Sequence, residues 1–260
     1  MSLRTDVVFG GRTAGFAAYS LGTIARWEIE SRGKDGRQCE EILSATQLRF
    51  GRHMGRLFGL DVRCVGKAQD ERMAGKDARG VGRVFVSNHR SSLDILVMLA
   101  HLEGKFVSRG DLSQWPVIGP LARKSGMLFV EREDRRSAAN VVQAMIGRVE
   151  SGVGIIIFPE GTTFPGDEVR PFKPGAFAVA RRTGCELVPV GIAYGGDALT
   201  FGDESFLEHM RRVTGQPKTR VGLAIGAPTR AVQGEDSAAL AKRLHAEVQS
   251  LVGRARAEVG

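Results

Sequence analysis

The sequence VFVSNHRSSLDIL, residues 84–96, contains an apolar run, a polar loop and the beginning of a helical pattern. Val84 to Val86 predict a buried strand that ends at the polar pair after them. His89 and Asp94 are five positions apart, so on one helix they would point about 140° away from each other. They can meet if His89 lies in the loop and Asp94 in the first turn of the helix. The segment therefore predicts a strand–loop–helix unit in which a carboxylate orients an imidazole for acid–base chemistry.

The start of this helix is expected at Ser91 or Ser92. With Ser91 as the N-cap, Asp94 would be the third helical residue, where a carboxylate interacts favourably with the helix dipole. The same residues also fit a plainer reading, because Ser-x-x-Asp is an ordinary helix start and a histidine between strand and helix is often just a loop residue. Both readings stay open on this segment alone.

The composition indicates a globular protein with an anionic partner. Of the 260 residues, 42% are hydrophobic and 25% are charged, which is ordinary for a globular chain. The formal net charge of +8 indicates nucleic acid, an anionic membrane, a phosphorylated ligand or an acidic carrier protein. Nucleic acid is disfavoured, because the chain has no zinc-type Cys/His spacing, no basic low-complexity tail, and just two Tyr and two Trp.

The cysteines and the hydropathy pattern indicate a reducing compartment. Cys39, Cys64 and Cys185 are scattered and odd in number, which argues for free thiols rather than a disulfide framework. The chain begins without the continuous apolar segment of a secretory signal, and no stretch approaches the roughly 20 apolar residues that span a bilayer. We expect a cytoplasmic protein that is peripherally associated with the inner face of the membrane.

Residues 1–60 are expected to form an amphipathic helix pair that precedes an α/β domain of residues 61–260. The first helix is expected at 16–28 and the second at 42–60, where apolar residues alternate with basic ones. Such segments are typical of helices at an anionic lipid surface, although two helices packed on the domain would look the same. The second helix has glycines at every fourth position, which would let another helix approach closely: Gly51, Gly55 and Gly59.

From residue 61 onward, short apolar runs alternate with helical patterns. Strands are expected at residues 61–65, 83–87, 105–108, 127–130, 154–158, 187–193 and 220–225. Helices are expected at residues 92–102, 117–124, 136–151, 174–183, 203–213 and 237–255. This alternation predicts an α/β fold with a mainly parallel or mixed sheet flanked by helices. Pro189 cannot donate a ladder bond, so we expect it at an edge or a bulge.

Polar residues follow several of these strands, at the ends where α/β sheets bind ligands. They are Asn88-His89, Glu131-Arg132 and Pro159-Glu160-Gly161-Thr162-Thr163, with Phe172-Lys173-Pro174-Gly175 shortly after. Each group alone could be a tight or solvated turn. Their ordered placement behind successive strands indicates a common site.

Four blocks together resemble the glycerolipid acyltransferases of the lysophosphatidic acid acyltransferase (PlsC-like) superfamily. In order they are NHRSSLD (88–94), GMLFVER (126–132), FPEGTTF (158–164) and LVPVGIAY (187–194). FKPGAF (172–177) also fits, and the match extends over about residues 60–227. A His-x4-Asp pair alone is a weak signal, whereas four blocks in the family's order are specific.

The resemblance implies a role for each motif residue. His89 would be the general base and Asp94 the residue that orients it. Arg132 would hold the acceptor phosphate, with Lys173 as a weaker candidate. The remaining substrate-binding positions would be Asn88, Glu160, Gly161 and Thr162. No metal or other cofactor is implied, because the acyl donor, acyl-CoA or acyl-carrier protein, is a substrate.

The implied reaction acylates a lysophospholipid, with 1-acyl-glycerol-3-phosphate as the first acceptor and phosphatidic acid as the product. A lyso-ornithine lipid, glycerol phosphate or another lysolipid are the alternatives. The family commonly has a basic residue after FPEGT and an aspartate before the arginine of its second motif, where this chain has Thr163 and Glu131. The first departure bears on the acceptor.

Two other classes of protein are weighed against this one. A serine hydrolase that used Ser91 or Ser92 would need a G-x-S-x-G elbow, which the sequence lacks. A non-catalytic membrane-binding protein would explain the basic amphipathic start but not the ordered motifs at the strand ends.

Overall fold

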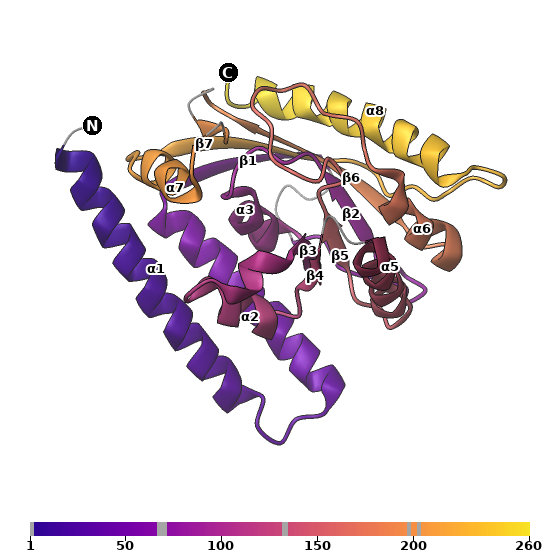
Figure 1. The fold of residues 1–260 in the computed structure, drawn as a ribbon, viewed down its shortest axis with the longest axis horizontal. Coiled ribbons are helices and arrows are strands. Elements are labelled where there is room, and N and C mark those ends of the chain that lie inside the picture. Colours follow the sequence, from indigo (N-terminus) through magenta and orange to yellow (C-terminus); the bar gives the residue numbers. More distant parts are fainter. Residues whose placement is uncertain (1–2, 67–71, 132–134, 197–198, 202–203) are drawn as a thin grey trace.

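The computed structural model describes residues 3–66, 72–131, 135–196, 199–201 and 204–260. Within these residues, a seven-stranded sheet is flanked by helices on both faces (Figure 1). Across the sheet the strands follow in the order β1 (Leu60–Gly66), β7 (Thr219–Ile225), β6 (Leu187–Tyr194), β2 (Val84–Ser87), β5 (Ile155–Ile157), β3 (Lys105–Arg109) and β4 (Leu128–Val130). The predicted α/β class and all seven predicted strands are confirmed.

The sheet is mixed, because β6 and β7 pair antiparallel while the other described neighbours pair parallel. Pro189 was expected at an edge or a bulge; the edge is wrong, since β6 is an interior strand between β7 and β2, and the irregular pairing beside it fits the bulge. Pro189 lies where the pairing with β7 is interrupted, between the Leu187–Thr229 bridge and the Val190–Ile225 pair. Its missing N–H therefore removes no ladder bond.

The helices follow the predicted order with shifted ends. They are α1 (Leu3–Glu30), α2 (Gly36–Leu57), α3 (Asp94–His101), α4 (Ile118–Lys124), α5 (Arg135–Glu150), α6 (Ala178–Thr183), α7 (Phe206–Thr214) and α8 (Ser237–Ala257), with short 3-10 helices η1 (Gly110–Gln114) and η2 (Pro174–Phe177). The first two helices begin earlier than predicted. Helix α2 starts at a capping box, in which the Asp35 side chain accepts from the Gln38 amide.

Two buried layers hold the sheet. Because strand side chains alternate between faces, Val84 and Val86 pack with α5, α6 and α8, whereas Phe85 packs with α2, α3 and α7. Helix α1 lies outside α2 and runs beside it (Figure 1), with Phe16 against Phe50 and Phe58. The two faces thus carry separate apolar cores, and the α2–α3 face is extended by α1.

None of the described helices is long and apolar enough to cross a bilayer. The three cysteines are free thiols; Cys185 is buried, and Cys39 and Cys64 are partly exposed. The division of the chain into residues 1–60 and 61–260 stays a prediction. Helix α2, from the first part, and α3, from the second, share one buried core.

Candidate functional site

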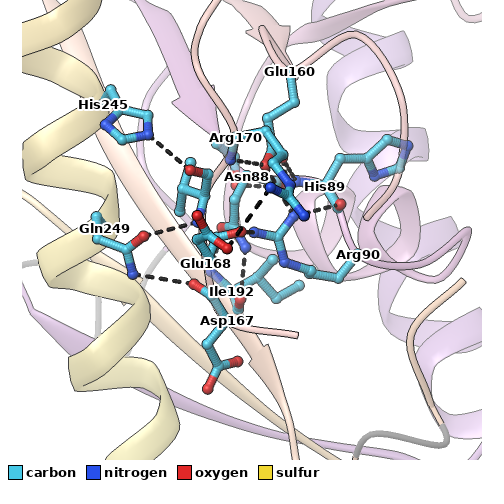
Figure 2. Close-up of polar contacts among 12 residues, drawn as sticks. Asn88, His89, Arg90, Glu160, Asp167, Glu168, Arg170, Ile192, His245 and Gln249 are labelled. Carbon is cyan, nitrogen blue, oxygen red and sulfur yellow. Dashed lines mark hydrogen bonds and ion pairs between the residues drawn. The ribbon is translucent and has the colours of Figure 1, made fainter. Parts of the chain in front are cut away.

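Asn88 fixes the point at which the chain leaves the sheet after β2. Its side chain has no exposed surface. The amide nitrogen donates to the carbonyl oxygen of Ile192 and the amide oxygen accepts from the Ile192 N–H, both at 2.9 Å (Figure 2). The side chain thus pairs with β6 as a backbone residue would. Asn88 therefore fixes the start of the loop by bonding it to β6.

His89 and Asp94 meet as the sequence predicted. His89 Nδ1 lies 2.7 Å from Asp94 Oδ2, and the Asp94 side chain is fully buried while that of His89 is 19% exposed. A carboxylate can only accept, so Nδ1 carries the proton and Nε2 of a neutral His89 keeps its lone pair. The ring of His89 also stacks on Phe158, with centroids 4.1 Å apart. These contacts hold the imidazole in one orientation.

The helix after this loop begins at Asp94 and not at Ser91 or Ser92 as predicted. Asp94 Oδ2 accepts from the amides of Arg90 at 2.7 Å and Ser91 at 3.0 Å, so the carboxylate closes the turn that precedes its own helix. Ser91 Oγ accepts from the Leu93 amide at 3.3 Å, before the helix starts. The carboxylate of Asp94 thus satisfies two backbone amides of the loop as well as the ring of His89.

Tyr194, which the sequence analysis did not single out, completes the surroundings of Asp94. Its hydroxyl donates to Asp94 Oδ1 at 2.6 Å, and the side chain is buried. Burial and the negative charge of Asp94 both raise the pKa of Tyr194 well above its usual value, so the phenol stays a donor. The signal in the sequence was a tyrosine in register with Val188, Val190 and Ile192, a period-two face that is otherwise aliphatic.

Glu160 lies beside the loop and joins it to the turn after β5. Its side chain is fully buried and pairs with Arg90, whose NH1 lies 3.0 Å from Oε1 and 3.1 Å from Oε2. The His89 amide donates to Oε2 at 2.7 Å and the Arg170 amide to Oε1 at 2.8 Å (Figure 2). Both oxygens are thus occupied by donors from the protein, although the sequence analysis expected Glu160 to contact substrate.

Helix α8 braces the segment that Glu160 holds, from the other side of the sheet. Gln249 accepts from the Val169 amide at 2.8 Å and donates to the Asp167 carbonyl at 3.1 Å. His245 Nε2 lies 2.8 Å from the Val169 carbonyl. Figure 2 shows His245 and Gln249 on one side of this segment and Arg90 and Glu160 on the other, so packing on α8 supports the turn beside His89.

Three of the other predicted site residues gather at the turn after β5. Gly161 has φ +82°, which suits glycine, and a Cβ there would come within 2.6 Å of Lys173 Nζ. Lys173 therefore lies over Gly161, next to the exposed Thr162. All three line the same cavity as His89. Arg132 lies outside the described residues.

The cavity in front of His89 has a volume of about 1110 Å³ and is largely apolar. Its walls come from α1, α2, α3, η1, α4, α5 and α7, and include Phe16, Phe50, Leu96, Leu121, Leu207 and Met210. Polar side chains, among them His89, Thr162 and Lys173, contribute to the wall at the strand ends. The site therefore joins a polar group poised for proton transfer to a large space for apolar chains.

The structure also bears on the serine alternative. Ser91 has no exposed surface, so its hydroxyl cannot reach a substrate carbonyl. Ser92 lines the cavity, but the imidazole described here is held by Asp94. Among the described residues, no group of three or more His, Cys, Asp or Glu side chains could hold a metal ion.

The sequence of this chain is similar to those of known acyltransferases. Residues 69–193 match the family described as Acyltransferase. A lyso-ornithine lipid O-acyltransferase of Brucella abortus is 30% identical over 222 residues, which cover 78% of this chain and 80% of that protein. A 1-acyl-sn-glycerol-3-phosphate acyltransferase of Neisseria meningitidis is 26% identical over 227 residues, which cover 85% of this chain and 86% of the relative.

A solved structure has the same fold. It is the crystal structure of the 1-acyl-sn-glycerophosphate acyltransferase PlsC from Thermotoga maritima, which superposes with a TM-score of 0.71 at 22% sequence identity. The superposition covers 98% of this chain and 95% of the other. The likeness extends to the N-terminal helices as well as the sheet.

Proposed function

This chain belongs to the acyltransferase family, and on that premise we propose that it transfers a fatty acyl group from a thioester to the free hydroxyl of a lysolipid. The observation that carries the proposal is the His89–Asp94 pair at the wall of a large apolar cavity. A buried carboxylate fixes the tautomer, and the second ring nitrogen is left to accept a proton. The apolar space suits a substrate with long acyl chains.

The reaction needs one base that also acts as an acid. His89 Nε2 would remove the proton of the acceptor hydroxyl while its oxygen bonds to the thioester carbonyl carbon. The tetrahedral intermediate would then collapse, the C–S bond would break, and the imidazolium would return the proton to the thiolate. Asp94, held by the Tyr194 hydroxyl and two amides, would orient the ring and stabilise its charged form. No cofactor takes part in this scheme.

The headgroup of the acceptor would lie at the turn after β5. Lys173 and Thr162 offer a cation and a hydroxyl on the cavity wall, and Gly161 leaves room for them. Arg132 would add the second cation for a phosphate. Asn88 and Glu160 would act indirectly, by holding the loop, since their polar atoms bond to the protein.

Two acceptors are proposed in turn. The first is 1-acyl-glycerol-3-phosphate, after the Neisseria relative and because cations at the site suit a phosphate. The second is a lyso-ornithine lipid, favoured by the higher identity to the Brucella relative and by Thr163, which puts no cation after the FPEGT motif. The donor is acyl-CoA or acyl-carrier protein; both are anionic, as the net charge of +8 favours.

The surface of α1 supports a peripheral position at an anionic membrane, on its cytoplasmic side. Val7, Leu21 and Ile29 are 67%, 59% and 65% exposed. At 3.6 residues per turn they lie within about 80° of one another around the helix. An exposed apolar row on a basic protein suits the interface of an anionic bilayer. A lysolipid could then enter the cavity, which α1 lines, from the membrane.

Thiol release with vesicles that contain a lysolipid tests the proposal. We expect the wild type to consume long-chain acyl-CoA or acyl-carrier protein, and His89→Ala to lose nearly all turnover while keeping its fold by circular dichroism. His53→Ala is the matched control and should turn over normally, because the His53 ring stacks on Tyr19 and does not line the cavity.

The acceptor is decided by competition. Equal amounts of lysophosphatidic acid and a lyso-ornithine lipid are offered together, and the diacyl products are separated by mass.

Turnover that survives in His89→Ala would refute the mechanism. A wild type that binds vesicles but acylates none of the lysolipids would refute the enzymatic proposal.

A further inference from the structure

His209, which lies outside the four family blocks, contacts the loop between β2 and α3 that carries His89. His209 lies on α7, and its Nε2 is 3.0 Å from Ser91 Oγ, a residue 118 positions earlier. Its Nδ1 is 2.9 Å from Glu204 Oε1. Glu204 in turn accepts from Arg212, whose Nε lies 2.9 Å from Oε2. The result is a Ser–His–Glu arrangement of the kind that activates a nucleophile in hydrolases.

Burial excludes that chemistry here. Ser91 and His209 have no exposed surface, so the hydroxyl cannot meet a substrate. The arrangement instead determines which atom donates and which accepts in each hydrogen bond. Glu204 is held ionised, because hydrogen bonds from Arg212 lower its pKa to about 2. Nδ1 of His209 therefore donates to Glu204, and Nε2 of the neutral ring accepts the Ser91 hydroxyl proton.

Ser91 connects this ring to the proposed base. Its backbone N–H donates to Asp94 Oδ2 at 3.0 Å, on the same oxygen that holds His89. Its hydroxyl, which His209 holds, also accepts from the amide of Leu93 at 3.3 Å, directly before Asp94. The Ser91 side chain therefore ties His209 to the loop backbone that bears both Asp94 and the amide bonded to it. The neighbouring loop is tied to the same place, since the Phe201 amide donates to the Arg90 carbonyl at 2.7 Å and the Phe201 ring lies 4.3 Å from that of His209.

The other side of α7 forms part of the cavity. Phe206, Leu207 and Met210 line it, as do Phe201 and Glu204 before the helix. His209 therefore lies between the wall that would contact an acyl chain and the loop that carries the base. A shift of α7 would be transmitted to Ser91 through a buried hydrogen bond, which is costly to leave unmade.

We propose that His209, held by Glu204, is a positioning residue for acyl transfer: through Ser91 it fixes Asp94 and His89, and it ties their loop to the α7 wall of the cavity. This inference rests on the proposed function for its kinetic meaning and on the described contacts for its geometry.

The kinetic test compares His209→Ala with His209→Gln, whose side-chain oxygen can still accept from Ser91. For the alanine variant we expect kcat to fall about 10- to 100-fold, the size of effect that misplacement of a catalytic group has, with little change in KM for the thioester. The glutamine variant should recover most of kcat. His101→Ala is the control, because His101 bonds to the Val97 carbonyl of its own helix.

A spectroscopic test needs no turnover. In protein labelled with ¹⁵N-histidine, the Nδ1–H signal of His89 is identified by its loss in His89→Ala. We expect it to shift or broaden in His209→Ala and to persist in His209→Gln and His101→Ala. If His209→Ala does not fold, Ser91→Ala removes the same bond and should give the same changes; where both fold, the double variant should be no worse than either one.

An unchanged His89 signal in a folded His209→Ala variant would overturn the inference. So would a loss of kcat that His209→Gln fails to relieve, or that His101→Ala matches, because that would indicate general destabilisation. If the wild type turns over no lysolipid, the proposed function fails, and the His89 signal still decides whether His209 positions the loop.

Discussion

The two carboxylates of the site, Asp94 and Glu160, are both buried and both saturated with hydrogen bonds, yet their partners differ. Asp94 faces a titratable ring, whereas Glu160 faces the guanidinium of Arg90 and two amides. A buried ion pair gives little net stability, but the loss of one partner leaves an uncompensated charge and costs about 3–5 kcal/mol. At the scale of residues, Glu160 is therefore expected to hold the loop.

Glu160→Gln separates the two roles that this residue has been given. We expect the free energy of unfolding to fall by about 3–5 kcal/mol, because Arg90 loses its counter-charge in the interior. Turnover should fall through kcat, because one of the two amides, that of His89 or that of Arg170, then faces a side-chain NH2 in place of an acceptor, with KM for the lysolipid little changed. Urea denaturation and steady-state kinetics measure both.

A direct substrate contact would give the reverse result: a raised KM for the lysolipid at unchanged stability. Glu150→Gln, which neutralises an exposed carboxylate at the end of α5, should alter neither quantity.

The sequence predicted which residues meet in the site better than it predicted what they do. The spacing of His89 and Asp94 required a loop and a helix start, so their contact followed from local geometry. Tyr194 reaches Asp94 from 100 positions away, across the sheet, and no local pattern encodes that distance. The direction in which the Glu160 carboxylate points likewise depends on Arg90 and Arg170, which tertiary folding brings to it.

At the scale of elements, α2 and α3 are packed unusually closely through one glycine. A Cβ at Gly51 would lie 2.6 Å from the backbone nitrogen of Ala100 and 2.9 Å from Leu99 Cβ, whereas one at Gly55 would meet nothing within 4 Å. The spacing of glycines in the sequence predicted a close helix contact, and the structure assigns it to Gly51. Helix α3 carries Asp94, so this contact supports the site.

Alanine at the two positions should have opposite effects. Gly51→Ala forces α2 and α3 apart and is expected to lower the free energy of unfolding by about 1–3 kcal/mol. Gly55→Ala keeps the packing and gains helix propensity, so it should raise that free energy by roughly 0.5–1 kcal/mol. Urea denaturation of both variants provides the comparison; equal changes would show that the α2–α3 contact is not tight.

Helix α8 is anchored by an ion pair that makes stability depend on pH. Arg243 donates to both oxygens of Glu235 at 2.9 Å, and these hydrogen bonds lower the pKa of Glu235 to about 2. Since the pKa in the unfolded chain is about 4.3, the pair stabilises the fold above that pH, and its contribution disappears as the pH falls toward 2.

Glu235→Gln should accordingly have a lower free energy of unfolding than the wild type at pH 6. The difference, measured by urea denaturation, should shrink steadily between pH 5 and pH 2.5. A difference independent of pH would show that hydrogen bonding alone, without the charge, anchors the helix.

The strands were predicted well because each is short, strongly patterned and bounded by turn residues, whereas α1 and α2 begin earlier than predicted. The order of the strands across the sheet was not predicted. The chemistry of Pro189 left an edge and a bulge open, and only the tertiary fold decides between them: β7, much later in the chain, pairs beside β6 and leaves a break at the proline. Which strands become neighbours is decided by contacts that a local pattern cannot express.

At the scale of the whole molecule, the net charge and the exposed apolar row on α1 both favour an anionic membrane surface. The net charge of +8 and the apolar row on α1 together predict binding to anionic vesicles that weakens with salt. The opposite face of the same helix, with Phe9, Phe16 and Trp27, lines the cavity, so binding would place the cavity behind α1 as seen from the bilayer.

Leu21→Asp tests this surface. A leucine that moves from water into the bilayer contributes about 1.5–3 kcal/mol, so its loss should weaken vesicle binding about tenfold or more. Sedimentation with phosphatidylglycerol vesicles at several salt concentrations measures it. Val232→Asp makes a matched change at a residue that is 64% exposed, in the loop before α8, and should leave binding intact. Equal losses in the two variants would mean that charge alone governs binding.

The sheet order also has a consequence in time. Strand β1 is made early, yet the strand it pairs with, β7, begins at Thr219, and Arg12 of α1 donates to the carbonyl of Pro217 at 3.1 Å. During synthesis on the ribosome, α2 can pack on α3 early, whereas β1 and Arg12 find their partners only after residue 219 has emerged. A nascent chain halted before residue 219 would leave β1 without β7, the strand it pairs with, and would expose this apolar edge to other chains.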